Sequence, residues 1–298
     1  MTLRDGIFEC RKILMRIPFI LHILLLGICA VAQVAAPQGI QTFKFGDCKV
    51  VCIQDALMRL PARLFSDTAS TGHRLSGGFH ESSVNVFLVQ KDGNVFLVDA
   101  GHDQMRGSLR GKLKQAGISP EAVSGVLITH LHPDHVGGLL WDGKPLFPSA
   151  ILYIAKEEYE TWRKDASRNS LAKYLTPYEG RIRLFEYGTA LPNGVVPEKR
   201  GGHTPGHTIF RMSHDGRDEL VFVGDIAHAV DLQFPHPTFC AKYDASPAEA
   251  VASRIQTLKM KGILFGAHFP FPGIARGGQV AKGAPNWAFV WKKYDSAQ

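Results

Sequence analysis

The chain has 298 residues, of which 45% are hydrophobic and 20% charged, with 30 glycines and 17 prolines spread along it. This composition is that of an ordinary globular protein, and it excludes a disordered chain, a collagen and a coiled coil. The formal net charge is +7, but the lysines and arginines form no basic block, which argues against a nucleic-acid-binding groove.

The first predicted element is an export signal. An apolar run over residues 17–32 follows basic residues and ends in a small-x-small pattern at Ala32, as before a signal-peptidase cut. We therefore predict a signal peptide over residues 1–32, cleaved near Ala32, and a single domain over residues 33–298 in the periplasm or outside the cell. An uncleaved anchor helix is one alternative, and a start at Met15, which leaves a shorter leader, is another.

The first half of the mature chain is predicted to hold a loop, a hairpin and a helix. A polar stretch over residues 66–82 predicts a long loop. Residues 84–90 and 95–98 flank the turn Lys91-Asp92-Gly93-Asn94 and predict a β-hairpin. Apolar residues at every fourth position then predict an amphipathic helix over residues 104–116.

The second half alternates strands and helices. Strands are predicted at residues 126–128, 151–154, 209–212, 220–223 and 263–265, and helices at residues 156–165 and 247–259. The last helix is predicted to have Ser246 as its N-cap, Pro247 at its first position and Glu249 completing a capping box. Strands in runs with helices between them predict an α/β fold in which two sheets pack face to face with helices outside.

Three histidines and one aspartate crowd into one short segment after an apolar strand: His130, His132, Asp134 and His135. In an extended chain the side chains of His130 and His132 point the same way, because alternate residues share a face. Pro133 then turns the chain, so that Asp134 and His135 approach from another direction. The segment predicts two half-sites for metal ions, and a histidine-rich surface turn is the alternative.

Three more residues of ligand type each close an apolar strand or a turn: His207, Asp225 and His268. Each alone could equally be a structural polar residue, but together with the first cluster they complete a site for two metal ions. Nitrogen and oxygen ligands without a cysteine favour zinc or a similar first-row divalent ion. His203, which lies in the same turn as His207, is predicted to be a turn residue rather than a ligand.

The order of these motifs resembles that of the metallo-β-lactamase superfamily, in which His-x-His-x-Asp-His is followed by a histidine, an aspartate and a final histidine. The resemblance covers residues 43–294 and is strongest to the methyl parathion hydrolase and N-acyl homoserine lactone lactonase branches. It implies a four-layer αββα sandwich of two mixed sheets, forming one hydrolase domain over residues 33–298 that holds two divalent metal ions, expected to be zinc.

The resemblance divides the seven ligands between two ions: His130, His132 and His207 for the first, Asp134, His135 and His268 for the second, and Asp225 as the bridge. A hydroxide held between the ions is the implied nucleophile, since zinc lowers the pKa of bound water toward about 7. Asp134 is implied to be catalytic as well as a ligand, because its carboxylate can orient the nucleophile or pass a proton to the leaving group.

Three further residues are candidates for positions beside the ligands or the substrate. Asp99 matches the superfamily's aspartate after the early hairpin and is implied to fix a ligand histidine, with a helix N-cap as the alternative. Trp162 resembles an aromatic wall of the parathion enzyme, with a core position as the alternative. His228 stands where lactonases usually carry a tyrosine aimed at the substrate carbonyl, and it is either a hydrogen-bond donor or a structural histidine.

These residues predict an exported enzyme that hydrolyses lactones, esters or organophosphate triesters. The alternatives are a nuclease or a thioesterase of the same superfamily, and a binding protein that kept the fold without catalysis. We expect a small-molecule substrate, no nucleic-acid partner and no stable membrane association after leader cleavage, and a homodimer is left open.

Overall fold

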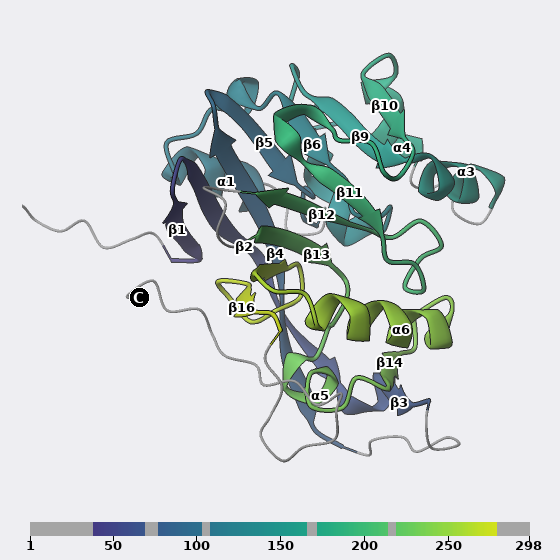
Figure 1. The fold of residues 1–298 in the computed structure, drawn as a ribbon. Coiled ribbons are helices and arrows are strands. Elements are labelled where there is room, and N and C mark those ends of the chain that lie inside the picture. The colour runs from purple at the N-terminus through teal and green to yellow at the C-terminus, as the bar shows by residue number, and fades with distance from the viewer. Residues whose placement is uncertain (1–37, 69–76, 103–107, 166–171, 214–218, 279–298) are drawn as a thin grey trace, which may run out of the picture. The chain divides into compact units, whose positions relative to one another are not determined.

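A computed structural model describes residues 38–68, 77–102, 108–165, 172–213 and 219–278 (Figure 1). The predicted leader lies outside these residues. Contacts divide the chain into two units, Met1–Ala35 and Ala36–Gln298, and all described elements belong to the second. None of the described helices combines the length and the apolar character needed to cross a bilayer.

After an initial run of five strands, helices and strands alternate along the described chain. The strands are β1 (Ile40–Phe45), β2 (Cys48–Pro61), β3 (Phe65–Asp67), β4 (Phe79–Lys91), β5 (Asn94–Val98), β6 (Gly125–Leu127), β7 (Leu140–Trp141), β8 (Lys144–Pro145), β9 (Ile151–Ala155), β10 (Ile182–Phe185), β11 (Val196–Lys199), β12 (Thr208–Ser213), β13 (Glu219–Gly224), β14 (Phe239–Ala241), β15 (Ile263–Gly266) and β16 (Ile274–Arg276). The helices are α1 (Ser108–Gln115), α2 (Pro133–Val136), α3 (Lys156–Lys164), α4 (Ala172–Leu175), α5 (Val230–Gln233) and α6 (Pro247–Leu258).

The first sheet has seven strands in the order β1-β2-β4-β5-β6-β9-β10. Its strands are antiparallel from β1 to β5 and parallel from β5 to β10. The predicted hairpin joins β4 to β5, and both central residues of its turn, Asp92 (φ 50°) and Gly93 (φ 75°), have the positive φ that a two-residue hairpin turn requires.

The second sheet has five strands in the order β11-β12-β13-β15-β16, of which only the β13–β15 pair is parallel. An aromatic core lies between the two sheets. The ring of Phe265 lies 5.4 Å from Phe87 of the first sheet and 4.8 Å from Phe222 of its own. The predicted packing of two mixed sheets face to face is therefore confirmed.

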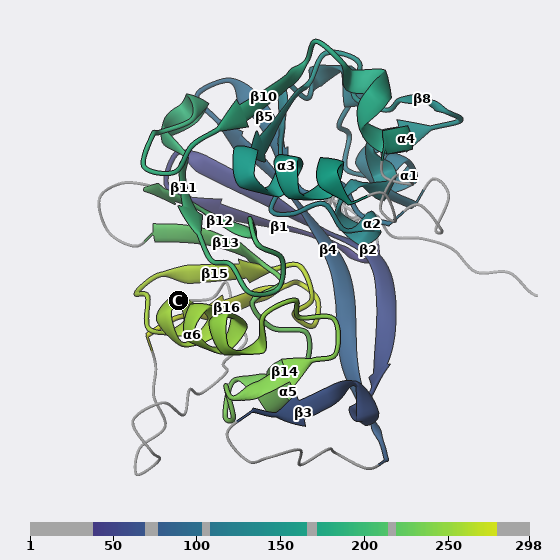
Figure 2. The same cartoon turned by 90° about the vertical axis from the view of Figure 1, so that its right-hand side faces the viewer.

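Helices cover the outer faces of both sheets (Figures 1 and 2). Leu109 and Leu113 of α1 are buried with the outer side chains of the first sheet. Leu258 of α6 and Val230 of α5 are buried with those of the second sheet. Since each sheet is apolar on both faces, four layers result, as the resemblance implied.

Strands β2 and β4 continue together beyond the first sheet toward β3, β14 and α5 (Figure 2). This corrects the long loop predicted over residues 66–82, because β3 includes Ser66 and Asp67 and β4 begins at Phe79; residues 69–76 lie outside the described part. Polar residues predicted a loop here, but they also occur in the strand: Ser82 is buried in β4, and its hydroxyl donates to the carbonyl of His268 (3.2 Å).

Two helix predictions need adjustment at their first turns. The helix predicted over residues 104–116 is described from Ser108, and residues 103–107 are outside the described part. α6 begins at Pro247 as predicted, but the Ser246 side chain makes no capping hydrogen bond. Instead, the Ser246 backbone N–H donates to the carbonyl of Gly202 (2.8 Å), which holds a neighbouring loop against the start of α6.

Candidate metal centre

The clustered histidines and aspartates lie where strands of both sheets end. β6 runs into residues 129–135, while β13 runs into Asp225 and β15 into the turn that carries His268. Because β13 and β15 are parallel neighbours, Asp225 and His268 both lie beyond the carboxyl ends of these strands, on the same side of the second sheet. A hydrogen bond from the Thr208 N–H to the carbonyl of Thr129 (2.9 Å) joins the two sheets there.

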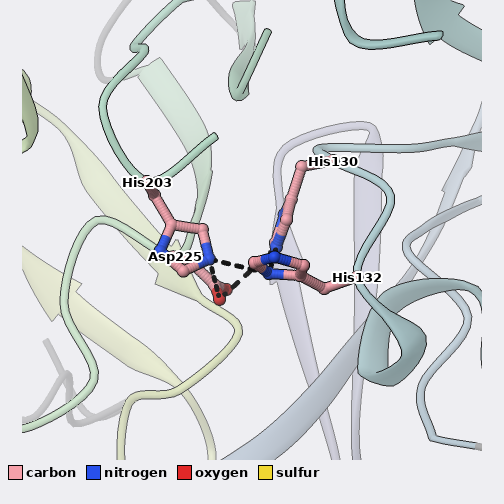
Figure 3. Close-up of side chains that lie close together, drawn as sticks. All are labelled: His130, His132, His203 and Asp225. Atoms are coloured by element: carbon pink, nitrogen blue, oxygen red, sulfur yellow. Dashed lines mark hydrogen bonds and ion pairs between the residues drawn. The ribbon is translucent and has the colours of Figure 1, made fainter. Parts of the chain in front are cut away.

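Four side chains converge on one point and form what we call the His203 group: His130, His132, His203 and Asp225 (Figure 3). His132 Nδ1 lies 2.9 Å from both His130 Nε2 and His203 Nε2. Asp225 Oδ2 lies 3.2 Å from His203 Nε2 and 3.6 Å from His130 Nε2. Four ligands in a tetrahedron around zinc would be about 3.3 Å apart, so the spacing fits one divalent ion.

A second convergence, the His268 group, consists of Asp134, His135 and His268 beside the same Asp225. Asp134 Oδ2 lies 3.4 Å from His268 Nε2 and 3.9 Å from His135 Nε2. His135 Nε2 and Asp225 Oδ1 are 3.1 Å apart, yet both are buried without a hydrogen-bond partner among the described residues. Two buried atoms this close that satisfy no hydrogen-bond geometry with each other remain available to bind a second cation.

Asp225 lies between the two groups. Its Oδ1 faces His135, while its Oδ2 lies 3.1 Å from His268 Nε2 and 3.2 Å from His203 Nε2. The residue is 3% exposed, so its charge is shielded from water and acts on its neighbours at short range. The carboxylate can therefore contribute one oxygen to each group.

Oxygen atoms behind the cluster fix the orientation of three histidines. Each histidine donates from Nδ1: His203 to Asp244 Oδ1 (2.9 Å), His135 to Asp99 Oδ2 (2.8 Å) and His268 to the carbonyl of Ser83 (2.6 Å). A proton held at Nδ1 leaves the lone pair of Nε2 directed into the cluster, which is the tautomer that binds a metal.

Asp99 makes the predicted contact with a histidine of the cluster and serves a second one indirectly. Its Oδ2 accepts from His135 Nδ1 and from the Thr129 hydroxyl (2.8 Å each), and its Oδ1 accepts from the Thr129 N–H (2.8 Å). The Thr129 hydroxyl in turn accepts from His130 Nδ1 (3.1 Å). One carboxylate thus orients a histidine of each group.

The prediction that His207 holds a metal, with His203 as a turn residue, is wrong. His207 Nδ1 donates to the carbonyl of Arg200 (3.0 Å), and His207 Nε2 accepts from the Asp225 N–H (3.0 Å). With both ring nitrogens bonded to the main chain, His207 has no free ligand atom. His203 Nε2 takes the place in the cluster that His207 was expected to occupy.

Trp162 and His228 both lie beside the cluster. The Trp162 ring is partly exposed and meets His132 edge-on with centroids 5.5 Å apart, while it also packs against the outer core. His228 Nε2 lies 3.1 Å from Asp225 Oδ2, and His228 Nδ1 is buried without a hydrogen-bond partner in the described part. Burial lowers the pKa of His228 to about 4, so the neutral ring donates from Nε2 to Asp225.

Burial and neighbouring charges set the protonation of the cluster. Burial lowers the pKa of His132 to about 3 and holds that of His130 well below its ordinary value. Burial opposes protonation of His268 too, but Asp225 and Asp134 raise its pKa to about 10. Burial disfavours ionisation of Asp225, yet the surrounding histidine rings hold its pKa well below the usual range. Ionised carboxylates and unprotonated nitrogens are the forms that bind a cation, which would displace the remaining protons.

Sequence reasoning missed His203, Asp244 and the buried Glu158. The structure shows how the place of His203 is set: Gly202, which precedes it, has a φ of 115°, and a Cβ there would lie 2.1 Å from the Ala250 N atom of α6. Glycine allows this close approach, but neither the φ nor the contact can be read from the sequence. Asp244 and Glu158 carry no signal in the sequence either, because their partners are distant along the chain.

A family model identifies the superfamily of this chain. Residues 81–276 match the family model of the metallo-beta-lactamase superfamily. The probable metallo-hydrolase YflN of Bacillus subtilis (strain 168) is 30% identical over 194 residues, which are 57% of this chain and 72% of YflN. The solved structure of the hydrolase AbOPH, in the beta lactamase superfamily, has a TM-score of 0.72 at 28% identity, covering 86% of this chain and 99% of AbOPH.

A further solved structure is that of AidC, a dizinc quorum-quenching lactonase in complex with a product. Its TM-score is 0.73 at 23% identity, and the alignment covers 86% of this chain and 98% of AidC. At that identity the likeness concerns the fold.

Proposed function

The chain belongs to the metallo-beta-lactamase superfamily, and we propose that it hydrolyses uncharged esters, lactones or phosphotriesters with two divalent ions, one in each histidine group. The observation that carries this proposal is the place of Asp225, a buried carboxylate with oxygens within 3.2 Å of His135, His203 and His268. The donors are nitrogen and oxygen atoms only, which favours zinc. Bound ions would supply a hydroxide nucleophile at neutral pH and polarise the oxygen of the substrate.

The side chains that face solvent suggest where the substrate enters. Most of the cluster is buried, but His132 and Asp134 are partly exposed, with 23% of the Asp134 side chain accessible. Burial favours the neutral form of Asp134, but His135 and His268 hold the pKa of its carboxyl below the usual range. Asp134 would thus be an ionised acceptor that takes a proton from the nucleophile and passes it to the leaving group.

An exposed tyrosine lies beside the cluster. Tyr243, 39% exposed, packs its ring against His228 with centroids 4.9 Å apart. Burial raises the pKa of Tyr243, and the charged side chains that raise it further are the carboxylates Asp225, Asp244 and Asp134. Two of these carboxylates, Asp225 and Asp134, belong to the proposed ligand groups, so bound cations would offset their charge. The lactonase AidC, which shares the fold, supports an uncharged lactone as one class of substrate.

The test combines metal content with turnover. Full-length protein loaded with zinc is assayed on a chromogenic aryl ester, a homoserine lactone, a phosphotriester and single-stranded RNA. We expect two ions per chain and turnover of at least one neutral substrate. Asp225→Asn should lose an ion and reduce turnover by more than the 10- to 100-fold typical of residues that only support a ligand.

The matched control is Asp231→Asn, the same change at a mostly exposed carboxylate on α5, which should leave metal content and turnover unchanged. Two bound ions without turnover of any substrate would favour a binding protein, and cleavage of RNA alone would favour a nuclease.

We also propose that residues 1–32 are an export signal that places the enzyme in the periplasm or outside the cell. The support is the apolar run over residues 17–32 with its small-x-small ending at Ala32. N-terminal sequencing of the mature protein from cell fractions tests this. A first residue near Gln33 is expected, whereas an intact leader in the membrane fraction would contradict the proposal.

A further inference from the structure

A buried carboxylate on α3 connects the two segments that supply the histidines of the His203 group. Glu158 is 1% exposed and belongs to neither group of ligands. We propose that Glu158 is a positioning residue that holds these histidines at the spacing a divalent ion needs. The inference rests on the proposed function, since it assumes that the His203 group binds a metal.

Four hydrogen bonds converge on the Glu158 carboxylate. Its Oε1 accepts from the Leu131 N–H (3.0 Å) and from Trp162 Nε1 (2.5 Å). Its Oε2 accepts from the Thr204 hydroxyl (2.8 Å) and from the Gly206 N–H (3.0 Å). The carboxylate thus bonds to its own helix and to two segments more than 70 residues apart in the sequence.

The donors stand next to the ligands. Leu131 lies between His130 and His132, and Thr204 directly follows His203. His132 Nδ1 and His203 Nε2, which come from these two segments, are 2.9 Å apart. A shift of either segment would therefore change the separation of two ligand atoms, and the shared carboxylate resists such a shift.

The loop is pressed closely against α3 at the same place. A Cβ added to Gly206 would lie 2.4 Å from the Glu158 N atom, so only glycine allows this approach. Burying a carboxylate is costly unless hydrogen bonds compensate, and four donors can be satisfied together only by a group that accepts on both oxygens. Glutamine at residue 158 has the same size, but its NH2 would face two donors.

The experiment measures metal affinity rather than activity. The metal-free full chain, carrying Glu158→Gln, is titrated with Co²⁺ and followed by visible absorption and equilibrium dialysis. We expect one of the two ions to bind 10- to 100-fold more weakly than in the unmodified protein, as is typical when a partner of a ligand is lost. His203→Ala, which removes a ligand of this group, supplies the reference spectrum for the ion that remains.

The matched control is Glu160→Gln, the same change at an exposed residue of α3, which should bind both ions normally. Thr204→Val removes one of the four donors and keeps Glu158, so it should weaken the same ion by a smaller factor even if Glu158→Gln folds poorly. Both ions binding to Glu158→Gln and Thr204→Val with unchanged affinity and spectrum would overturn the inference. Two bound ions without any turnover would instead contradict the proposed function and leave the role of Glu158 in metal binding unaffected.

Discussion

The segment after β6, residues 129–136, and the loop before β12, residues 201–208, both bring histidines to the cluster, but in different ways. In the first, ligand residues stand close together in the sequence, and Pro133 begins the one-turn helix α2 that redirects the chain. In the second, two histidines four residues apart are candidates for one place, and His203 occupies it because main-chain groups bond both ring nitrogens of His207.

The difference shows when spacing is enough to identify a ligand. Where ligands share one short segment, the local geometry of strand and helix sets their directions. Where a loop takes its path from distant elements, those elements decide which side chain faces the cluster. The 201–208 loop is held by Glu158 of α3 and by the start of α6, where the Ala245 N–H donates to the carbonyl of His203 (3.1 Å).

The largest expected effect distinguishes the two histidines of the 201–208 loop, His203 and His207. His203→Ala should lose one of the two ions and lower turnover by more than 100-fold, because a ligand has been removed and not merely its support. His207→Gln should keep both ions but lower the free energy of unfolding by about 1–3 kcal/mol, since one of its two buried main-chain partners loses its bond. Metal content per chain and urea denaturation measure the two effects.

If His207→Gln lost an ion while His203→Ala kept two, the assignment of the ligand in this loop would be reversed. His236→Gln, at an exposed histidine, controls for a general effect of losing a ring.

The comparison also marks how far the sequence predicts the fold and the site. Apolar runs predict β4, β5, β9, β12 and β15, because burial alone selects them. The β3–β14 pair is not predicted, because it is short and joins segments that are distant in the sequence, Phe65–Asp67 and Phe239–Ala241. Six of the seven predicted ligands face the cluster. The seventh, His207, is misplaced because main-chain groups of Arg200 and Asp225 engage both of its ring nitrogens, which the sequence pattern does not show.

A smaller effect distinguishes the carboxylates that support the two regions. Asp99 accepts three hydrogen bonds from the 129–136 segment and orients histidines of both groups, whereas Asp244 bonds to His203. Asp99→Asn should weaken both ions by 10- to 100-fold, and Asp244→Asn should weaken one. Competition with a chromogenic chelator measures both affinities.

The His203→Ala background sharpens this test, because only the His268 group remains to bind an ion. There, Asp99→Asn should still weaken the remaining ion, since it acts on His135, and Asp244→Asn should have no effect. Equal effects of Asp99→Asn and Asp244→Asn in this background would contradict the assignment of Asp99 to His135 and of Asp244 to His203 alone.

The smallest expected effect concerns a side chain that touches the cluster from outside both regions. Tyr243 packs on His228 and is 39% exposed, so we expect its hydroxyl to contact a substrate bound beside the cluster. Tyr243→Phe keeps the ring and removes one hydrogen bond, which should lower kcat/KM by about 2- to 10-fold with metal content unchanged. Tyr153→Phe, on β9, should change neither quantity and serves as the matched control. Loss of an ion from Tyr243→Phe would show instead that the hydroxyl supports the metal ligands. Tyr243 would then belong with the 129–136 segment and the 201–208 loop as a determinant of metal binding.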